Sequence, residues 1–233
     1  MHPTVKNARI AGALYVLLGI VGPLRLIYIP NKLFVAGNAT ATANNIAAHE
    51  TLFRVGILSD LIGATIVIFV TLALYRLLKD VDQGLAVVMV ILGSLMVTPI
   101  YFVNTINDAA ALLFARGADF LSVFDSAQRD AFAMVFLRLH HAGVLANEIF
   151  WGLWLFPLGL LIYRSRFLPR FLGVWLMLAC FAYLALSFTG ILVPQYEDKV
   201  FTFTQPLMLG EVATMLWLLI RGANVKRAAA AAA

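Results

Sequence analysis

The chain has 233 residues and a formal net charge of +5, with 62% hydrophobic residues and only 12% charged ones. A soluble domain is about half apolar and about a quarter charged, so this composition excludes an ordinary soluble fold and predicts an integral membrane protein. The Lys and Arg residues lie mostly beside apolar segments. Membrane topology therefore explains the positive charge better than nucleic-acid binding, and we expect no nucleic-acid partner.

Six apolar segments are long enough to cross the hydrocarbon layer as helices, which needs about 20 residues. They are expected near residues 8–29, 53–78, 84–114, 130–163, 168–193 and 204–222. We therefore predict an all-α fold, a polytopic membrane bundle of six transmembrane helices in a single domain over residues 1–227. The first segment is too long for the core of a signal peptide and is expected to remain as a span. The alanine run 228–233 is set aside as an added or placeholder tail.

The connectors between these segments alternate in charge. The cations on one side are Lys6, Arg9, Arg76, Lys79, Arg164, Arg166, Arg170, Arg221, Lys226 and Arg227. The connectors on the other side carry fewer cations and most of the acidic residues, so the positive-inside rule predicts that both termini are cytoplasmic. On the outer side, Asp125 or Ser126 is expected to cap the fourth span, and ATANNIAAHETLF is expected to allow a short surface helix.

Polar side chains within the spans gather in the outer half of the predicted bilayer. They are Arg54 and Asp60 in the second span, Asn104, Asn107 and Asp108 in the third, Arg138, His140, His141, Asn147 and Glu148 in the fourth, and Glu211 in the sixth. Helical spacing puts the third-span group on one stripe, and His141 and Glu148 on one face. Because a charge in lipid is costly, we expect this set to converge on the bundle interior or on a wet pocket. Arg25, at the outer end of the first span, is expected to snorkel to the interface.

Three kinds of site fit this polar set. It can be a buried network of ion pairs that fixes helix register, or a pocket for a small amphiphile or lipid headgroup with arginines on its anionic group. It can also be a catalytic site, with His140 or His141 as general base and Glu148 orienting it. The same histidines and carboxylates are possible ligands of a divalent metal, but the adjacent rings diverge by about 100° and no HExxH motif is present. We assign no metal and leave the cofactor open.

Several stretches, in order along nearly the whole chain, resemble one prokaryotic membrane-protein family. They are ARIAGALYVLLG, TLFRVGILSDLIG, LLFARGADFLSVFDSAQRDAFAMVFLRLHHAG, IYRSRFLPRFLGVWLMLACFAYL and LMLGEVATMLWLLIRG. The family is known as domain of unknown function 4386. The resemblance implies six spans in a bacterial-type plasma (inner) membrane and implies no activity. Its FRxGxxSDL and GE motifs fall on Arg54, Asp60 and Glu211.

The expected function is a non-enzymatic membrane binding or accessory protein, alone or as a subunit of a larger complex. Its expected partners are membrane lipids and other membrane subunits. One alternative is a membrane-embedded enzyme that acts on a lipid-like substrate from the outer side with His141, Glu148 and Asp60. The other is a proton-coupled transporter with Glu211 as the proton carrier.

Overall fold

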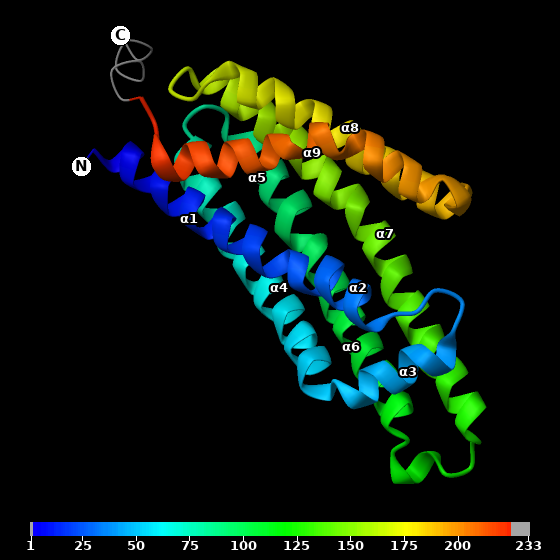
Figure 1. The fold of residues 1–233 in the computed structure, drawn as a ribbon. Helices are drawn as coiled ribbons and strands as arrows, with labels where there is room; N and C mark the ends of the chain where they lie inside the picture. The colour runs from blue at the N-terminus through cyan, green and yellow to red at the C-terminus, as the bar shows by residue number, and fades with distance from the viewer. Residues whose placement is uncertain (1, 225–233) are drawn as a thin grey trace. The chain divides into compact units, whose positions relative to one another are not determined.

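The computed structural model describes residues 2–224, and every regular element in that part of the chain is helical (Figure 1). The α-helices are α1 (Pro3–Pro23), α2 (Ile29–Leu33), α3 (Ala39–Ala48), α4 (Glu50–Leu78), α5 (Gln83–Val90), α6 (Val97–Arg116), α7 (Ser126–Ser165), α8 (Arg170–Leu192) and α9 (Glu197–Ile220). Two π-helical turns, η1 (Leu24–Tyr28) and η2 (Ile91–Leu95), follow α1 and α5. Two 3-10 turns, η3 (Asp119–Leu121) and η4 (Pro194–Tyr196), lie before α7 and α9. In a helix the backbone N–H and C=O groups form hydrogen bonds with one another. A chain that crosses lipid requires this, because no water is available there to bind these groups.

Among residues 2–224, six helices are long and apolar enough to cross a membrane, which confirms the predicted all-α, six-span fold. They cover Pro3–Leu33, Glu50–Leu78, Gln83–Arg116, Ser126–Ser165, Arg170–Leu192 and Pro194–Ile220. The last one begins before the expected residue 204, because Glu197 and Asp198 in the first turn of α9 stabilise a helix N-terminus. The alanine run, Lys226 and Arg227 lie outside the described residues.

One predicted helix start agrees with the structure. The N–H of Gln128 donates to Oδ1 of Asp125 at 2.8 Å, and the N–H of Asp125 donates to Oε1 of Gln128 at 3.0 Å. This reciprocal capping box confirms Asp125 as the cap of α7.

The expected short helix in the stretch ATANNIAAHETLF corresponds in part to α3, which begins earlier, at Ala39, and ends at Ala48. The side chain of Asn38 accepts from the N–H of Ala41 and caps it, and the last residues of the stretch, from Glu50, belong to α4.

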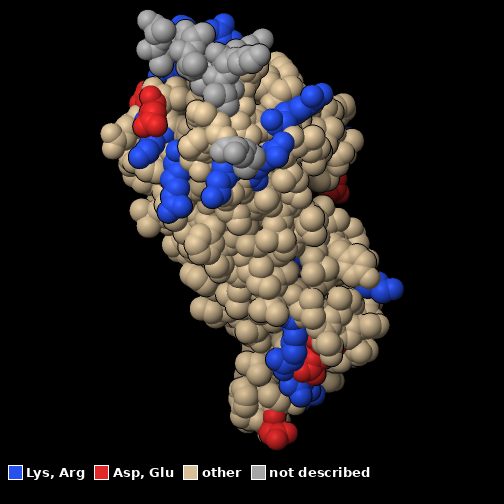
Figure 2. Space-filling model, turned by 90° about the vertical axis from the view of Figure 1, so that its left-hand side faces the viewer, with Lys and Arg blue, Asp and Glu red and all other residues tan. Residues whose placement is uncertain are grey.

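The chain forms two compact units, which we describe separately. Unit 1 contains the residues up to Gly19, Thr65–Thr98 and the residues from Leu145 onward, and unit 2 contains Ile20–Ala64 and Pro99–Val144. Several long helices, α4 and α7 among them, contribute segments to both units. On the face of the molecule in Figure 2, Lys, Arg, Asp and Glu gather in a few groups and leave wide areas without charge. Wide uncharged surface is what a lipid-facing chain requires.

Glycines allow the helices of unit 1 to approach closely. A side chain on Gly12 of α1 would meet the backbone of Leu219 in α9. Gly159 of α7 and Gly173 of α8 face one another in the same way, so that a side chain on either would meet the backbone of the other helix. Small residues at helix contacts are typical of membrane bundles, in which van der Waals packing drives association.

Unit 2 has its own apolar core and an interruption in its first helix. The core contains Ile29, Leu33, Ile46, Phe53, Ala111, Leu112 and Leu137, from α2, α3, α4, α6 and α7. Pro23 has no N–H to donate, and the helix after it widens into η1, where the N–H of Ile29 bonds to the carbonyl of Leu24. This π turn carries Arg25.

Candidate functional site

Arg25 is the centre of a polar cluster in unit 2. Arg25 is only 2% exposed. Its Nε donates to Oδ2 of Asp108 and its Nη2 donates to Oδ1 of the same carboxylate, both at 2.6 Å. The rings of Phe34 and Phe53 lie with their centroids 5.6 and 5.9 Å from the guanidinium carbon. A bidentate carboxylate and two aromatic faces thus enclose the positive charge.

The expectation that Arg25 snorkels to the interface is wrong. Asp108 supplies a buried counter-charge, so the guanidinium turns inward and leaves lipid and solvent. The helical segment continues beyond the expected residue 29 to Leu33, which puts Arg25 inside this segment and not at its end. The π turn was the missing information, because it changes which face of the helix each following residue occupies.

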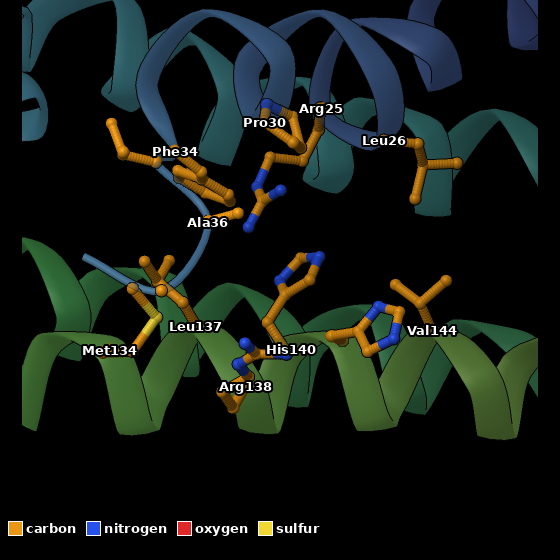
Figure 3. Close-up of a pocket in the computed structure, with 13 residues that line it drawn as sticks. Arg25, Leu26, Pro30, Phe34, Ala36, Met134, Leu137, Arg138, His140 and Val144 are labelled. Atoms are coloured by element: carbon orange, nitrogen blue, oxygen red, sulfur yellow. The ribbon is translucent and has the colours of Figure 1, made fainter. Parts of the chain in front are cut away.

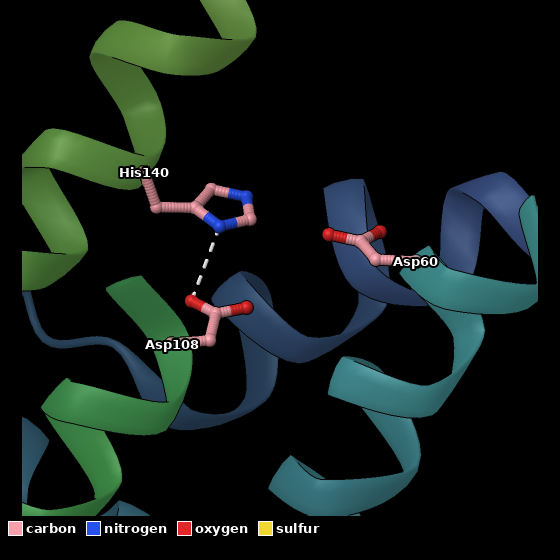
Figure 4. Close-up of side chains that lie close together, drawn as sticks. All are labelled: Asp60, Asp108 and His140. Atoms are coloured by element: carbon pink, nitrogen blue, oxygen red, sulfur yellow. Dashed lines mark ion pairs between the residues drawn. The ribbon is translucent and has the colours of Figure 1, made fainter. Parts of the chain in front are cut away.

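His140 and Asp60 complete the cluster. In Figure 4, Asp60 comes from α4, Asp108 from α6 and His140 from α7, and one ligand atom of each lies within 4.8 Å of the other two. His140 Nδ1 lies 3.1 Å from Oδ1 of Asp108 and 3.4 Å from the backbone oxygen of Asn104. These acceptors assign the Nδ1–H tautomer or the protonated ring. His140 Nε2 is buried and has no hydrogen-bond partner among the described residues.

The structure places His140, and not His141, beside Asp60. Residues next to one another on a helix point about 100° apart, so only one of the two rings can face α6. His140 is 3% exposed, whereas His141 is exposed. Spacing alone had left both histidines as candidates.

Two glycines make room for this cluster. A side chain on Gly56 of α4 would meet Ile29 and would lie 3.3 Å from Cδ of Arg25. A side chain on Gly143 of α7 would fall on the amide of Asn104. The buried Asn104 Oδ1 has no partner among the described residues, so the α6–α7 contact holds this amide by packing.

A pocket of about 360 Å³ opens beside the cluster in unit 2. Arg25 and His140 point toward one another across it from η1 and α7 (Figure 3). The lining consists of Arg25, Leu26, Pro30, Phe34, Val35, Ala36, Gly37, Met134, Leu137, Arg138, His140, His141 and Val144. These described residues combine apolar walls with arginine and histidine and include no acidic side chain. Such a lining suits a ligand with an anionic group and an apolar part.

The other predicted residues of unit 2 lie outside the buried cluster. Arg54 is exposed, and its Nε pairs with Oε1 of Glu50 at 2.7 Å. The Nε of Arg116 pairs with Oε2 of the same carboxylate at 2.9 Å. Arg138 is exposed at the pocket and forms no ion pair with a described residue. Asn107 is half-buried, one position before Asp108.

The remaining predicted residues, Asn147, Glu148 and Glu211, belong to unit 1. The Glu211 carboxylate accepts hydrogen bonds from the hydroxyl groups of Tyr15 and Tyr183, the latter at 2.7 Å. Sequence reasoning missed both tyrosines, because a Tyr in an apolar run is also an ordinary packing residue. Asn147 Oδ1 and Glu148 Oε2 are buried without a hydrogen-bond partner among the described residues.

A divalent metal would use the ligand atoms of Asp60, Asp108 and His140, which are hard oxygen and imidazole donors. In the structure both oxygens of Asp108 already accept from Arg25. A cation at this point would compete with the guanidinium for the same carboxylate. The donor set therefore fits an ion-pair network better than a metal centre.

Comparison with known proteins places this chain in a family. The family described as "Domain of unknown function (DUF4386)" matches residues 10–222. The chain belongs to this family. A DUF4386 protein is thus defined without an activity, and the FRxGxxSDL stretch of this one contributes Phe53, Gly56 and Asp60 to the surroundings of Arg25.

One similar protein has the printed name "Uncharacterized protein". It is a protein of Archaeoglobus fulgidus that is 28% identical over 160 residues, which cover 66% of this chain and 75% of the relative. No solved structure matches the chain.

Proposed function

We propose that this protein is a non-enzymatic membrane binding protein whose pocket in unit 2 holds the anionic group of a small amphiphile or lipid headgroup. The observation that carries the proposal is the lining of that pocket. It brings Arg25, Arg138, His140 and His141 together with apolar side chains and contains no acidic residue among those described. Cationic and hydrogen-bonding groups would bind the head, and the apolar walls would bind the beginning of a chain.

The two arginines have different parts in this proposal. Asp108 neutralises Arg25, whose guanidinium is already bidentate. Arg138 forms no ion pair with a described residue, so it supplies the charge that an anion would meet. Arg25 and His140 fix the floor of the pocket, and their partners keep both side chains in place.

The same lining favours binding over catalysis. Its described residues include no Ser, Thr, Cys, Lys or Tyr that would serve as a nucleophile. His140, the buried histidine, shares its Nδ1 with Asp108 and the backbone of Asn104. The proposed enzyme with His141, Glu148 and Asp60, the accessory subunit and the proton carrier at Glu211 stay predictions.

We further propose that both termini are cytoplasmic and that the pocket opens in the outer half of a bacterial-type plasma membrane. The cation-rich connectors at residues 76–79 and 164–170 support this orientation. The pocket residues from Arg25 to Gly37 lie at the C-terminal end of the first span, away from Lys6 and Arg9. Those from Met134 to Val144 lie in the N-terminal half of the fourth span, away from the connector at 164–170. Membrane lipids of that leaflet are then the nearest source of ligand.

The test compares two ligands that differ only in the head. Oleate and uncharged oleyl alcohol are titrated into the purified full-length protein in a neutral detergent, with Arg138→Gln as the variant. Loss of one charge-assisted contact is expected to weaken oleate binding about tenfold and leave oleyl alcohol unchanged. Arg129→Gln is the matched control, because this arginine also lies on α7 and does not line the pocket. Equal affinity for both ligands, or an equal effect of both substitutions, contradicts the proposal.

A further inference from the structure

A second pocket, in unit 1, has a different chemical character. It measures about 490 Å³ and lies where α4 and α7 end and α1 begins. Arg76, Arg164 and Arg166 line it together with a single carboxylate, Asp80. We propose that this pocket binds a phosphate group, carried either by an anionic phospholipid or by a soluble phosphate compound.

The arginines of this pocket differ in whether they form an ion pair. Nη1 of Arg164 donates to Oδ2 of Asp82 at 2.9 Å, while Oδ1 of Asp82 accepts from the N–H of Leu85 and caps α5. Each oxygen of Asp82 thus already has a partner, Arg164 or the cap of α5. Arg76 and Arg166 are exposed and form no ion pair with a described residue. Two guanidinium groups remain available to one anion, and the planar donor fork of each fits phosphate oxygens.

The backbone at Arg166 supports a functional position for this side chain. Among the non-glycine residues that the structure describes, Arg166 alone has a positive φ, which is 59°. A left-handed backbone is costly for a residue with a side chain, and glycine would adopt it without that cost. An arginine therefore occupies a position where the backbone conformation favours glycine. Residues in such costly conformations gather at functional sites.

The location favours a lipid headgroup as the source of the phosphate. The lining residues lie at helix ends, the level at which phosphates of a bilayer lie beside spanning helices. Basic pockets between helices at this level bind anionic headgroups, and each basic residue contributes to the attraction. Leu77 and Phe167 add apolar wall beside the arginines.

The experiment measures phospholipid binding by native mass spectrometry of the full-length protein in detergent. Phosphatidylglycerol and phosphatidylcholine with the same acyl chains are the probes, and we expect the anionic lipid to bind more tightly. Arg76→Gln and Arg166→Gly are each expected to weaken phosphatidylglycerol binding about fivefold. Arg166→Gly removes the charge and keeps a residue suited to the left-handed backbone, so its effect reports on the side chain. Arg170→Gln, a cation that stacks on Tyr163 outside this pocket, is the matched control with no expected effect.

A soluble competitor separates the two sources of phosphate. If glycerol 3-phosphate displaces phosphatidylglycerol, the phosphate is bound without acyl chains and a soluble compound is sufficient as the ligand; if it does not, acyl chains are required and the ligand is a lipid. Both results support a phosphate site. Equal binding of the two lipids, or unchanged phosphatidylglycerol binding in the Arg76→Gln/Arg166→Gly double variant, overturns it. The result is independent of the pocket in unit 2, because Arg138→Gln changes no residue of this site.

Discussion

Arg25 and Asp108 form a buried bidentate ion pair that joins the π turn after the first helix to α6, with both hydrogen bonds at 2.6 Å. The pair lies among apolar core residues and aromatic rings of unit 2, and its side chains are only 3% and 0% exposed. A charge in such a place is tolerated because of its partner. The pair therefore explains why an arginine and an aspartate occur within segments that are long and apolar enough to span a membrane.

Removing one member of this pair should be far more damaging than removing both. Arg25→Met removes both hydrogen bonds of the guanidinium and leaves the buried Asp108 carboxylate with His140 as its remaining partner, and we expect a loss of about 3–5 kcal/mol in the free energy of unfolding. The double variant Arg25→Met/Asp108→Leu should recover most of that loss. Thermal unfolding in detergent measures both, with Arg54→Met as the control, because its exposed pair with Glu50 contributes about 1 kcal/mol or less. Similar losses in Arg25→Met and Arg54→Met would be incompatible with a buried pair.

The two adjacent histidines should respond differently to the same substitution. His140→Phe keeps a ring of similar size and removes the nitrogen that faces Asp108, which we expect to cost about 1–3 kcal/mol of stability. His141→Phe, on the exposed side of α7, should cost less stability than His140→Phe, because it leaves the buried Asp108 contact intact. Chemical denaturation in mixed micelles compares the two proteins. If His141 proves the more sensitive position, the assignment of the inward-facing ring is wrong.

Gly143 should tolerate no side chain while Asn104 is present. Gly143→Ala puts a methyl group onto the Asn104 amide, and overpacking of this kind costs about 1–3 kcal/mol. Asn104→Ala in the same protein makes room and should restore part of the loss. Gly22→Ala serves as the control, because no neighbouring atom lies within 4 Å of the added methyl group. Equal melting temperatures for Gly143→Ala and Gly22→Ala would contradict the close α6–α7 contact.

Glu211 in unit 1 should depend on its two tyrosine donors. Glu211→Gln keeps one oxygen acceptor and replaces the other with an amide donor, so one of the two hydroxyl groups loses its partner. We expect Glu211→Gln and Tyr183→Phe each to cost about 1–3 kcal/mol. A double-mutant cycle measures the coupling, and the double variant should lose less than the sum of the single losses. Additive losses would mean that the two groups do not interact.

The sequence predicted the architecture well because hydropathy reports directly on burial in lipid. Six long apolar segments required six helices, and the possible caps Asp125 and Ser126 indicated where α7 begins. Helical spacing also grouped Asn104 with Asp108, and both are buried. These features are local, so periodicity along one segment is sufficient to find them.

The partners within the site were not predictable in the same way. Whether Asp108 pairs with Arg25, Arg54 or Arg138 depends on how four separate helices rotate about their axes, and a single sequence does not encode that in any local pattern. The π turn at Leu24–Tyr28 shifts the face of Arg25, and the choice between His140 and His141 depends on the rotation of α7. The predicted convergence of Glu148 and Glu211 with Asp60 stays a prediction.

The central claim, that the pocket in unit 2 binds an anionic amphiphile, is tested most directly by photolabelling. A fatty acid that carries a diazirine near its carboxyl end is irradiated with the purified protein, and the labelled residues are located by mass spectrometry. We expect labels on Leu26, Met134 and Val144, which line the pocket, and we expect excess oleate, but not oleyl alcohol, to remove them. Labels spread over the exposed apolar surface, without protection by oleate, would contradict it.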